Sequence, residues 1–241
     1  MNTAARTSPL DPRRLAGPVW VVSPHPDDEA LGCGALIAAL GSLGREVHAL
    51  LLTDGGFSHP HSRLFPRDRL ARTRLAEWRT GLALLGVPAT RTHALGLPDG
   101  ALAGVAPAEL QRRVARAFVA APPGTLLLPW RRDPHPDHRA AWEPVTAAAP
   151  PAARQLEYAV WLPERGEAVD WPAADEARIW TFAVGAARGL KARAIAAHVT
   201  QLGGVSDDPD GFTLAPEMVK RAVAGPERYA EAAAAGLEVR A

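Results

Sequence analysis

The sequence predicts a single α/β domain built on a mostly parallel sheet, with helices covering both faces of that sheet. Short apolar runs typical of buried strands alternate with longer segments of helical periodicity through most of the chain. A length of 241 residues with 47% hydrophobic content is sufficient for one substantial core. Residues 1–16 are predicted to be a flexible, polar lead-in, and residues 17–241 to form the domain.

The first half of the chain contains two strand–helix units. The apolar run at 19–23 predicts a buried strand, and the helix expected at 30–43 ends at Gly44, where a left-handed glycine is common. A second strand is predicted at 46–53. The loop at 57–66, rich in His, Ser and Pro, is expected to lie over the same sheet edge as the end of the first strand. From 67 to 85 apolar residues recur every three to five positions, which predicts a helix.

The second half continues the alternation. A short strand is expected at 92–95, a helix at 108–120 and a strand at 125–128. A helix at 138–149 should stop at Pro150-Pro151, because proline does not continue a helix. The remaining pattern predicts strands at 156–162 and 178–184, an amphipathic helix at 186–202 and a short helix at 216–223.

Composition excludes several classes of protein. A net charge of +1 argues against a nucleic-acid partner, which requires a clustered basic face. The apolar runs are shorter than the roughly 20 residues that a membrane span needs, and the N-terminal residues show no apolar signal segment, so a cytoplasmic protein is expected. The single cysteine fits a reducing compartment and provides no thiolate cluster. Any metal must therefore be bound by His and carboxylate side chains, while the oligomeric state is not indicated.

Two of the apolar runs end in clusters of ionisable side chains. The first strand leads into Pro24-His25-Pro26-Asp27-Asp28-Glu29, and the strand at 125–128 leads into residues 130–138. His25 and Asp28, three residues apart on a turn, can converge on one cation while Asp27 points elsewhere, but a third ligand is missing. If the two strands lie near each other in a parallel sheet, both clusters meet at its carboxyl edge, where α/β proteins bind ligands.

The glycines that follow the first cluster raise the alternative of a nucleotide-dependent enzyme. The dinucleotide fingerprint requires three glycines as G-x-G-x-x-G, and here Gly32 and Gly34 are followed by Ile37 at the third position. The carboxylates before them would also repel a pyrophosphate. A phosphate-binding loop is excluded because no Gly-Lys-Ser/Thr sequence follows.

The two clusters resemble the signature motifs of the LmbE-like, or PIG-L, family of zinc-dependent N-deacetylases. The resemblance covers residues 19 to about 202. Further similar segments are Leu31-Gly32-Cys33-Gly34, Thr53-Asp54-Gly55, Arg74-Leu75-Ala76-Glu77, Leu97-Pro98-Asp99-Gly100, His135-Pro136-Asp137-His138, and Lys191 with His198-Val199-Thr200-Gln201. The resemblance implies a Rossmann-like three-layer sandwich and hydrolysis of an N-acetyl or other N-acyl group on an amino sugar, such as an N-acetylglucosamine conjugate.

The resemblance also implies roles for particular residues. The family's metal ligands fall on His25, Asp28 and His138, and its general base falls on Asp27. Two imidazoles and one carboxylate suit a catalytic Zn²⁺ with an open position for water, although another divalent metal is possible. His135 matches the residue that faces the reacting carbonyl, and as an imidazolium it would stabilise the oxyanion and protonate the departing amine.

Other residues are expected to bind the substrate or to support the metal ligands. Arg74, Asp99 and Asp54 are candidates for substrate binding, although Arg74 and Glu77 could instead form a pair on one helix face. Glu29 and Asp137 are expected to support the ligands, and His198 is either a packed helix histidine or part of this outer layer. One or more of five tryptophans could stack on a sugar: Trp130, Trp142, Trp161, Trp171 and Trp180.

Two interpretations that do not involve catalysis stay open. The acidic turn at 25–29 could simply cap a helix, because carboxylates suit a helix N-terminus. The chain could also be a non-catalytic member of the same fold that binds a metal or ligand without turnover. A complete set of His25, Asp27, Asp28, His135 and His138 favours the enzyme, because a decayed site would be expected to lose at least one of them.

Overall fold

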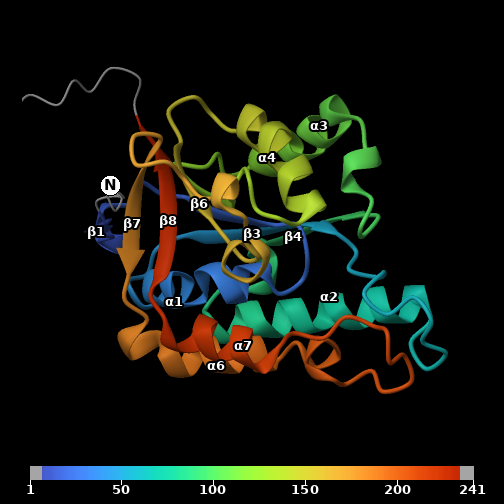
Figure 1. Cartoon of the computed structure of the whole chain (residues 1–241). Helices are drawn as coiled ribbons and strands as arrows, with labels where there is room; N and C mark the ends of the chain where they lie inside the picture. The colour runs from blue at the N-terminus through green and yellow to red at the C-terminus, as the bar shows by residue number, and fades with distance from the viewer. Residues whose placement is uncertain (1–6, 234–241) are drawn as a thin grey trace, which may run out of the picture.

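The computed structural model describes residues 7–233 as a sheet of eight strands between two layers of helices (Figure 1). The strands are β1 (Thr7–Pro9), β2 (Val19–Ser23), β3 (Val47–Thr53), β4 (Thr92–Leu97), β5 (Thr125–Pro129), β6 (Arg154–Tyr158), β7 (Ala177–Phe182) and β8 (Glu227–Ala232). The α-helices are α1 (Asp28–Ser42), α2 (Arg67–Leu84), α3 (Pro107–Phe118), α4 (Pro136–Ala148), α5 (Leu162–Arg165), α6 (Arg188–Ala196) and α7 (Pro216–Ala224). Short 3-10 helices occupy Pro12–Arg14, Ala89–Arg91, Leu102–Gly104, Ala168–Asp170, Gly185–Ala187 and Val199–Leu202. The predicted three-layer α/β architecture is confirmed.

The order of the strands places the two sequence clusters side by side. The sheet runs β1-β7-β8-β6-β5-β2-β3-β4, and β2 pairs in parallel with both β3 and β5. In that pairing Val19 lies opposite Thr125. The chain leaves β2 toward β3 on one side and leaves β5 toward β6 on the other. Such a switch point opens a crevice at the carboxyl ends of the strands, which is where ligands bind in this class of sheet.

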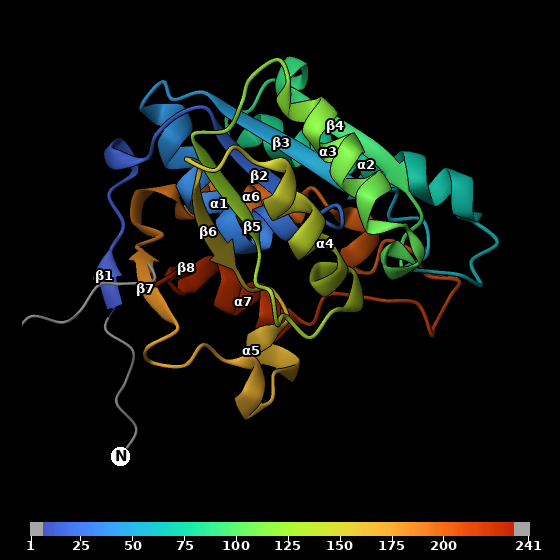
Figure 2. The same ribbon diagram turned by 90° about the horizontal axis from the view of Figure 1, so that it is seen from above.

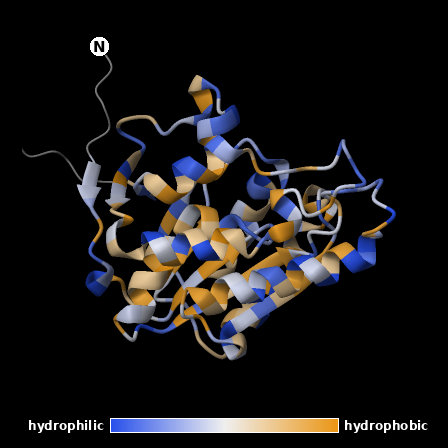
Figure 3. Ribbon diagram, turned by 90° about the horizontal axis from the view of Figure 1, so that it is seen from below, coloured by the Kyte–Doolittle hydropathy of each residue, from blue (hydrophilic) through white to orange (hydrophobic). Residues whose placement is uncertain are grey.

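The residues of β2 divide between two hydrophobic cores, one on each face of the sheet. Trp20 and Val22 belong to the core under α3 and α4, whereas Val19 and Val21 belong to the core under α1, α6 and α7. All these strand residues are buried, as expected for a parallel strand covered on both faces. Viewed from below, hydrophilic and hydrophobic residues are interspersed along the helices (Figure 3), as expected for helices with one packed side. None of the helices in residues 7–233 is long and apolar enough to cross a membrane.

Small residues in α1 allow unusually close packing on the sheet. A Cβ at Gly32 would lie 2.4 Å from Cδ2 of Tyr158, and one at Gly34 would lie 3.0 Å from Cγ of Lys191. The Tyr158 hydroxyl donates to the carbonyl of Val22, so the ring cannot easily move aside. Gly32 therefore serves the contact of α1 with the sheet and Gly34 the contact of α1 with α6, which agrees with the rejection of a nucleotide fingerprint.

The structure corrects the prediction for residues 1–16. Within the described part of that segment, Thr7–Pro9 forms β1 and pairs in parallel with β7, and Pro12–Arg14 forms a 3-10 helix. Leu10 and Leu15 are buried in the core. Residues 1–6 lie outside the described part of the chain. A strand of three residues is too short to produce a periodic sequence signal.

Three features of the C-terminal third also differ from the prediction. The strand predicted at 156–162 ends at Tyr158, and the chain then leads into α5, which stands out from the body of the molecule (Figure 2). The helix predicted at 186–202 is interrupted, because α6 ends at Ala196 and a separate 3-10 helix follows at Val199–Leu202. Strand β8 was not predicted, and it lies between β6 and β7, antiparallel to both.

We expect Gly32→Ala to destabilise the protein. The added methyl group would overlap the fixed Tyr158 ring, and overpacking of this kind costs about 1–3 kcal/mol. Gly189→Ala in α6 is the matched control, since its Cβ would meet no atom within 4 Å and alanine is favoured in helices by about 1 kcal/mol. Denaturant unfolding of both variants measures the difference. Equal stability of the two variants would contradict the packing argument.

Candidate metal centre and catalytic cavity

The turn between β2 and α1 holds the first cluster in a fixed and strained conformation. Thr53 at the end of β3 donates from its backbone N–H and its hydroxyl to the carbonyl of Pro24. Asp27 has φ 135° and ψ −25°, and it has the one positive φ of a non-glycine residue in residues 7–233. Side chains rarely adopt such a conformation, and strain of this kind is found at functional sites.

Three of the predicted ligands bring their donor atoms together. The Oδ2 atom of Asp28 lies 3.4 Å from Nδ1 of His25 and 3.2 Å from Nε2 of His138. His138 has no exposed surface, and neither of its ring nitrogens makes a hydrogen bond. Nitrogens of His25, His138 and His135 also lie within 4.8 Å of one another. Asp28 Oδ2 also accepts the backbone N–H of His25. A buried imidazole without a hydrogen-bond partner, beside a second ring and a carboxylate at such spacings, suits a shared cation.

The opposite nitrogens of the two ligand rings face other carboxylates. Asp137 Oδ2 lies 3.1 Å from Nε2 of His25 and also accepts the N–H of Gly100. Asp133 Oδ1 lies 3.3 Å from Nδ1 of His138. Carboxylates in this position fix the orientation of metal-binding histidines. The position of Asp137 agrees with the supporting role expected for it.

Asp133 is the residue that sequence reasoning missed. It has no exposed surface, and its Oδ2 atom accepts the N–H groups of Val160 and Trp161, each at 2.9 Å. Its position in the second cluster, beside the other His and Asp residues, is a signal that could have identified it. Its partners at 160 and 161 follow β6 and are visible only in the folded chain.

The buried histidines and carboxylates of this group shift one another's pKa. Burial would lower the pKa of His138, but Asp28 and Asp133 outweigh this effect and raise the pKa to about 9. The neighbouring carboxylates likewise raise the pKa of His25 well above its usual value, against the effect of burial. The pKa of Asp28 is lowered well below its usual range by the two rings, again against burial. The pocket thus stabilises positive charge at the point where the donor atoms converge.

Asp27 lies beside the ligands and is held by Arg74. Nη2 of Arg74 donates to Asp27 Oδ2 at 3.2 Å and to the carbonyl of Pro26 at 2.9 Å, while Nη1 donates to the carbonyl of Gly55. Burial raises the pKa of Asp27 to about 7, although Arg74 acts in the opposite direction. A carboxylate with such a pKa is suited to proton transfer at neutral pH.

Arg74, predicted as a substrate contact, has a structural role in this turn. Its side chain is 3% exposed, and it fastens the strained turn at Asp27 to the turn at Gly55. A side chain at Gly55 would collide with Pro26 and Arg74, and Gly55 has φ +66°. The alternative of a pair with Glu77 is wrong, because the Glu77 carboxylate accepts both the N–H and the hydroxyl of Thr200.

His135 differs from the predicted imidazolium. It is the N-cap residue of α4, and its Nδ1 atom accepts the N–H of Asp137 at 3.2 Å. Burial and the rings of His25 and His138 lower the pKa of His135 to about 4. The ring is consequently neutral near pH 7 and carries its proton on Nε2. A neutral ring of this tautomer can donate a hydrogen bond to a developing oxyanion.

A cavity of about 640 Å³ opens over this group of residues. Predicted site residues that line it are His25, Asp27, Asp28, Arg74, Asp99 and His135. The loop predicted to cover this edge contributes Phe57, Ser58 and Pro60, and residues 210–214 line the cavity beside that loop, since the N–H of Phe212 donates to the carbonyl of Ser58. Of the five tryptophans considered for sugar stacking, Trp161 lines the cavity, with the Arg165 guanidinium over its ring.

The two other candidates for substrate binding differ in position. Asp99 lines the cavity, its Oδ1 lies 3.3 Å from His25 Nε2, and the N–H of Phe57 donates to its Oδ2. Burial would raise the pKa of Asp99, but His25 and Arg74 lower it to about 2. Asp54 does not line the cavity. Its carboxylate pairs with Arg67 and accepts the N–H of Gly56, so it organises the turn.

Glu29 and His198 form a fully buried pair behind the ligands. Glu29 accepts from the indole N–H of Trp78, and its Oε1 lies 3.7 Å from Nε2 of His198. Burial and the nearby Asp27 and Asp28 raise the pKa of Glu29 to about 8, while burial lowers the pKa of His198 to about 3. Both groups are thus neutral near pH 7, and their place behind the turn matches the outer layer predicted for them.

Comparison with protein families identifies the chain. The PIG-L family model, described as GlcNAc-PI de-N-acetylase, matches residues 20–149, more than half of the sequence. The chain belongs to this family. Membership agrees with the LmbE-like motifs read from the sequence, since the matched segment contains both clusters.

Several characterised relatives of this PIG-L chain are named as deacetylases. A diacetylchitobiose deacetylase of Thermococcus kodakarensis is 35% identical over 51% of this chain and 45% of its own length. A 1D-myo-inositol 2-acetamido-2-deoxy-α-D-glucopyranoside deacetylase of Rhodococcus opacus is 30% identical over 80% of this chain and 68% of its own. A 2′-N-acetylparomamine deacetylase of Streptomyces fradiae is 33% identical over 66% of this chain and 61% of its own length. The match therefore spans less than two thirds of the first and third relatives.

Solved structures support the fold of this PIG-L chain. An N,N′-diacetylchitobiose deacetylase of Pyrococcus horikoshii, bound to an inhibitor, superposes with a TM-score of 0.57 and 22% identity, covering 76% of this chain and 70% of that one. The zinc-inhibited form of a teicoplanin deacetylase superposes with a TM-score of 0.61 and 17% identity, covering 88% of this chain and 96% of that one. At such identities the likeness establishes the architecture.

We expect Asp133→Asn to weaken binding of a divalent metal by about 10- to 100-fold, the usual effect of removing a carboxylate that orients a ligand histidine. The amide can still accept the N–H groups of Val160 and Trp161 but cannot supply the negative charge beside His138. The control is Asp175→Asn, a change in an exposed carboxylate. Competition with a chromophoric chelator measures affinity, and thermal unfolding checks the fold. Unchanged affinity in a folded Asp133→Asn protein would refute the orienting role.

Proposed function

We propose that the chain is a metal-dependent N-deacetylase that hydrolyses the N-acyl group of an amino sugar. The observation that carries this proposal is the convergence of His25, Asp28 and His138 beside the Asp27 carboxylate, at a cavity that His25, Asp27 and Asp28 line. A group of three ligands with a neighbouring base is the arrangement that metal-assisted amide hydrolysis requires. Family membership and the names of the relatives support the same reaction.

Zinc is the ion that we propose for the site. Ligand atoms at about 2.0–2.2 Å from a tetrahedral zinc ion lie roughly 3.3–3.6 Å from one another. The distances of 3.4 and 3.2 Å from Asp28 to the two rings are close to this spacing. A bound ion would supply an acidified water molecule and would polarise the amide carbonyl. The lone, buried Cys33 fits a reducing compartment, and we propose the cytoplasm as the site of action.

Asp27 is proposed to move the proton. As the general base it removes a proton from the attacking water molecule while Arg74 holds its carboxylate in place. Because its pKa is about 7, the same carboxyl group can return this proton to the departing nitrogen. The water oxygen bonds to the acyl carbon as Asp27 takes its proton, and the carbon–nitrogen bond breaks as Asp27 returns that proton to the nitrogen. The products are a carboxylic acid and an amine, which ionise to acetate and an ammonium group at neutral pH.

His135 is proposed to stabilise the oxyanion from its Nε2–H. Its other ring nitrogen is occupied by the N–H of Asp137, which fixes the donor on the side away from the α4 backbone. This role replaces the imidazolium acid expected from sequence, because a ring with a pKa of about 4 holds no spare proton at neutral pH. Asp137 and Asp133 orient the ligand rings of His25 and His138.

The polar lining of the cavity supports a sugar as the substrate. Asp99, Ser58 and Gln201 supply hydrogen-bonding groups, and Trp161 provides an aromatic surface. Sugar rings bind to such combinations of polar groups and aromatic faces. An N-acetylated glucosamine conjugate is therefore the substrate that we propose.

The direct test is to incubate the zinc-loaded protein with a panel of N-acetylated amino sugars and to measure new primary amine. Metal-stripped protein serves as the control, and re-addition of zinc should restore turnover. Release of amine from none of the sugars would contradict the proposed activity. Tight binding of a sugar without turnover would instead favour a non-catalytic member of the family.

We expect Asp27→Asn to reduce turnover by roughly 10²- to 10⁴-fold, the usual cost of losing a general base. The amide keeps the shape of the side chain and its contact with Arg74 but cannot accept the proton. Metal content should be unchanged, because Asp27 is not one of the three converging ligands. Near-normal activity would assign the role of the base to another residue, and Glu29 would be examined next.

A pair of histidine variants separates the ligand from the oxyanion donor. His138→Ala should lose the metal, because two remaining ligands rarely hold a catalytic ion. His135→Ala should keep the metal and lose about 10²- to 10³-fold in kcat, as for removal of an oxyanion donor. Elemental analysis and steady-state kinetics on both proteins provide the measurements. A metal-free His135→Ala protein, or a fully loaded His138→Ala protein, would require the roles within residues 135–138 to be exchanged.

A further inference from the structure

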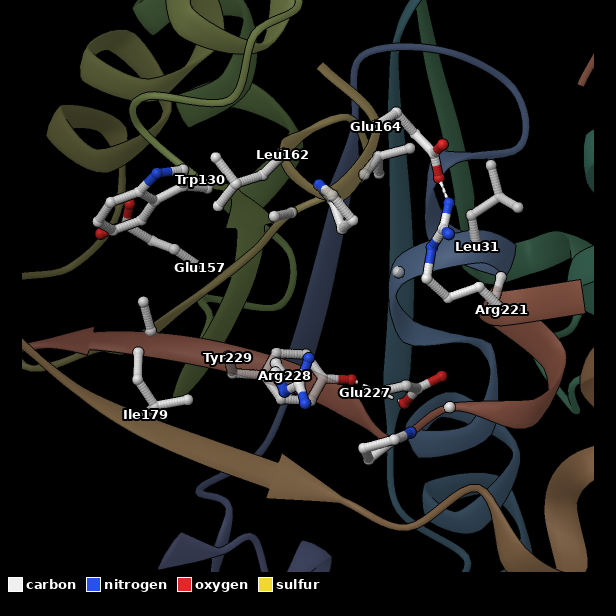
Figure 4. A pocket seen from close by; sticks show the side chains of 18 of the residues that line it. Leu31, Trp130, Glu157, Leu162, Glu164, Ile179, Arg221, Glu227, Arg228 and Tyr229 are labelled. Carbon is white, nitrogen blue, oxygen red and sulfur yellow. Dashed lines mark hydrogen bonds and ion pairs between the residues drawn. The ribbon is translucent and has the colours of Figure 1, made fainter. Parts of the chain in front are cut away.

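A second cavity, of about 360 Å³ (Figure 4), shares lining residues with the catalytic cavity. Its walls come from the end of β6, from α5 and α7, and from β8, and they are mainly apolar. Lining side chains include Leu162, Ile179, Met218 and Ala222. A cavity of this size and lining is in the range of small-molecule sites. The proposed reaction does not use it.

The acidic groups around this cavity are all paired. Glu227 accepts from Lys191 at 2.7 Å and from the hydroxyl of Tyr229 at 2.9 Å. Glu157 is paired with Arg131, and at the rim Glu164 is paired with Arg221 (Figure 4). No carboxylate lining the cavity among residues 7–233 is therefore left to bind a cationic ligand.

The two cavities adjoin at two partition residues, Leu31 and Val160, each of which lines both cavities. Leu31 lies three residues after Asp28 on α1, so it is on the same helix face as that ligand. The N–H of Val160 donates to Asp133, the carboxylate beside His138. Both partition residues are thus placed directly beside the ligand group. A substituent on the reacting carbonyl carbon would meet this partition within a few bonds.

We propose that the second cavity binds the hydrocarbon chain of the acyl group, so that the enzyme removes acyl groups longer than acetyl. This inference rests on the proposed deacetylase function. The two cavities divide by polarity. Asp99, Ser58 and Gln201 line the catalytic cavity and suit the sugar, whereas the second cavity suits an alkyl chain. The reaction is the same hydrolysis: water adds to the acyl carbon, the carbon–nitrogen bond breaks, and the products are a fatty acid carboxylate and a free amino sugar.

The test compares glucosamine carrying N-acetyl, N-butanoyl, N-hexanoyl and N-octanoyl groups. Each additional CH₂ buried in the cavity should raise kcat/KM by about fourfold, until the cavity is filled. A flat or falling series in the wild-type protein would overturn the proposal. An increase in kcat/KM with octyl glycosides of N-acetylglucosamine, absent from the acyl series, would overturn it too. The cavity would then bind the alkyl chain of the aglycone and not that of the acyl group.

A matched pair of variants in α7 links the effect to the cavity. Ala222 lines the cavity, whereas Ala224 on the same helix is exposed and does not. Ala222→Phe should abolish the increase with chain length and leave hydrolysis of the N-acetyl compound unchanged, and Ala224→Phe should behave as the wild type. Retention of the full increase in Ala222→Phe would refute the assignment.

Binding distinguishes failure of this inference from failure of the proposed function. If the N-acetyl compound is hydrolysed but the chain-length series is flat, the activity stands and the cavity assignment falls. If no compound is hydrolysed, the proposed function falls, and calorimetry of N-octanoyl- and N-acetylglucosamine tests the cavity alone. Tighter binding of the octanoyl compound, lost in Ala222→Phe, would support the cavity assignment, and equal binding would overturn it.

Discussion

The parallel pairing of β2 with β5 is the constraint on which the site depends. Val19 lies opposite Thr125, so two clusters that are more than a hundred residues apart in sequence leave the same edge of the sheet from neighbouring strands. Neighbouring strands are about 4.8 Å apart, close enough for Asp28 from one turn to meet His138 from the other. The chain moves away from this point in both directions, through β3 and through β6, and this leaves the edge open for a substrate.

The arrangement is held against considerable electrostatic and conformational cost. Asp28, Asp133 and Asp137 are buried around two imidazoles, and burial of charge is unfavourable unless each group is paired. Asp27 also carries a strained backbone. Arg74 holds the strained turn, because it pairs with Asp27 and ties two turns together through their carbonyl oxygens. A group of buried carboxylates of this kind favours a cation at its centre. The contacts of Arg74 that hold the turn also hold Asp27 beside that centre.

The sequence predicted the central part of the structure more fully than its margins. Long buried strands and the two motifs carry strong local signals, and the side chains of His25, Asp28 and His138, predicted as ligands, lie close together. Asp133 and Arg74 could not be assigned in full, because their partners, Val160 and Asp27, are distant in sequence. The neutral state of His135 also depends on tertiary contacts, since it results from burial beside two other rings.

Strand β8 shows why the unpredicted part of the chain matters for selectivity. Its sequence lacks an extended apolar run, yet it inserts between β6 and β7 and directs Glu227 and Tyr229 toward the helices of one face. There Glu227 accepts the N–H groups of Ala35 and Leu36 and pairs with Lys191, which fixes β8 against α1. The same strand forms a wall of the apolar cavity. The residues proposed to hydrolyse the amide thus follow strongly patterned strands, while the surface proposed to select the acyl chain is built from segments whose positions only the complete fold determines.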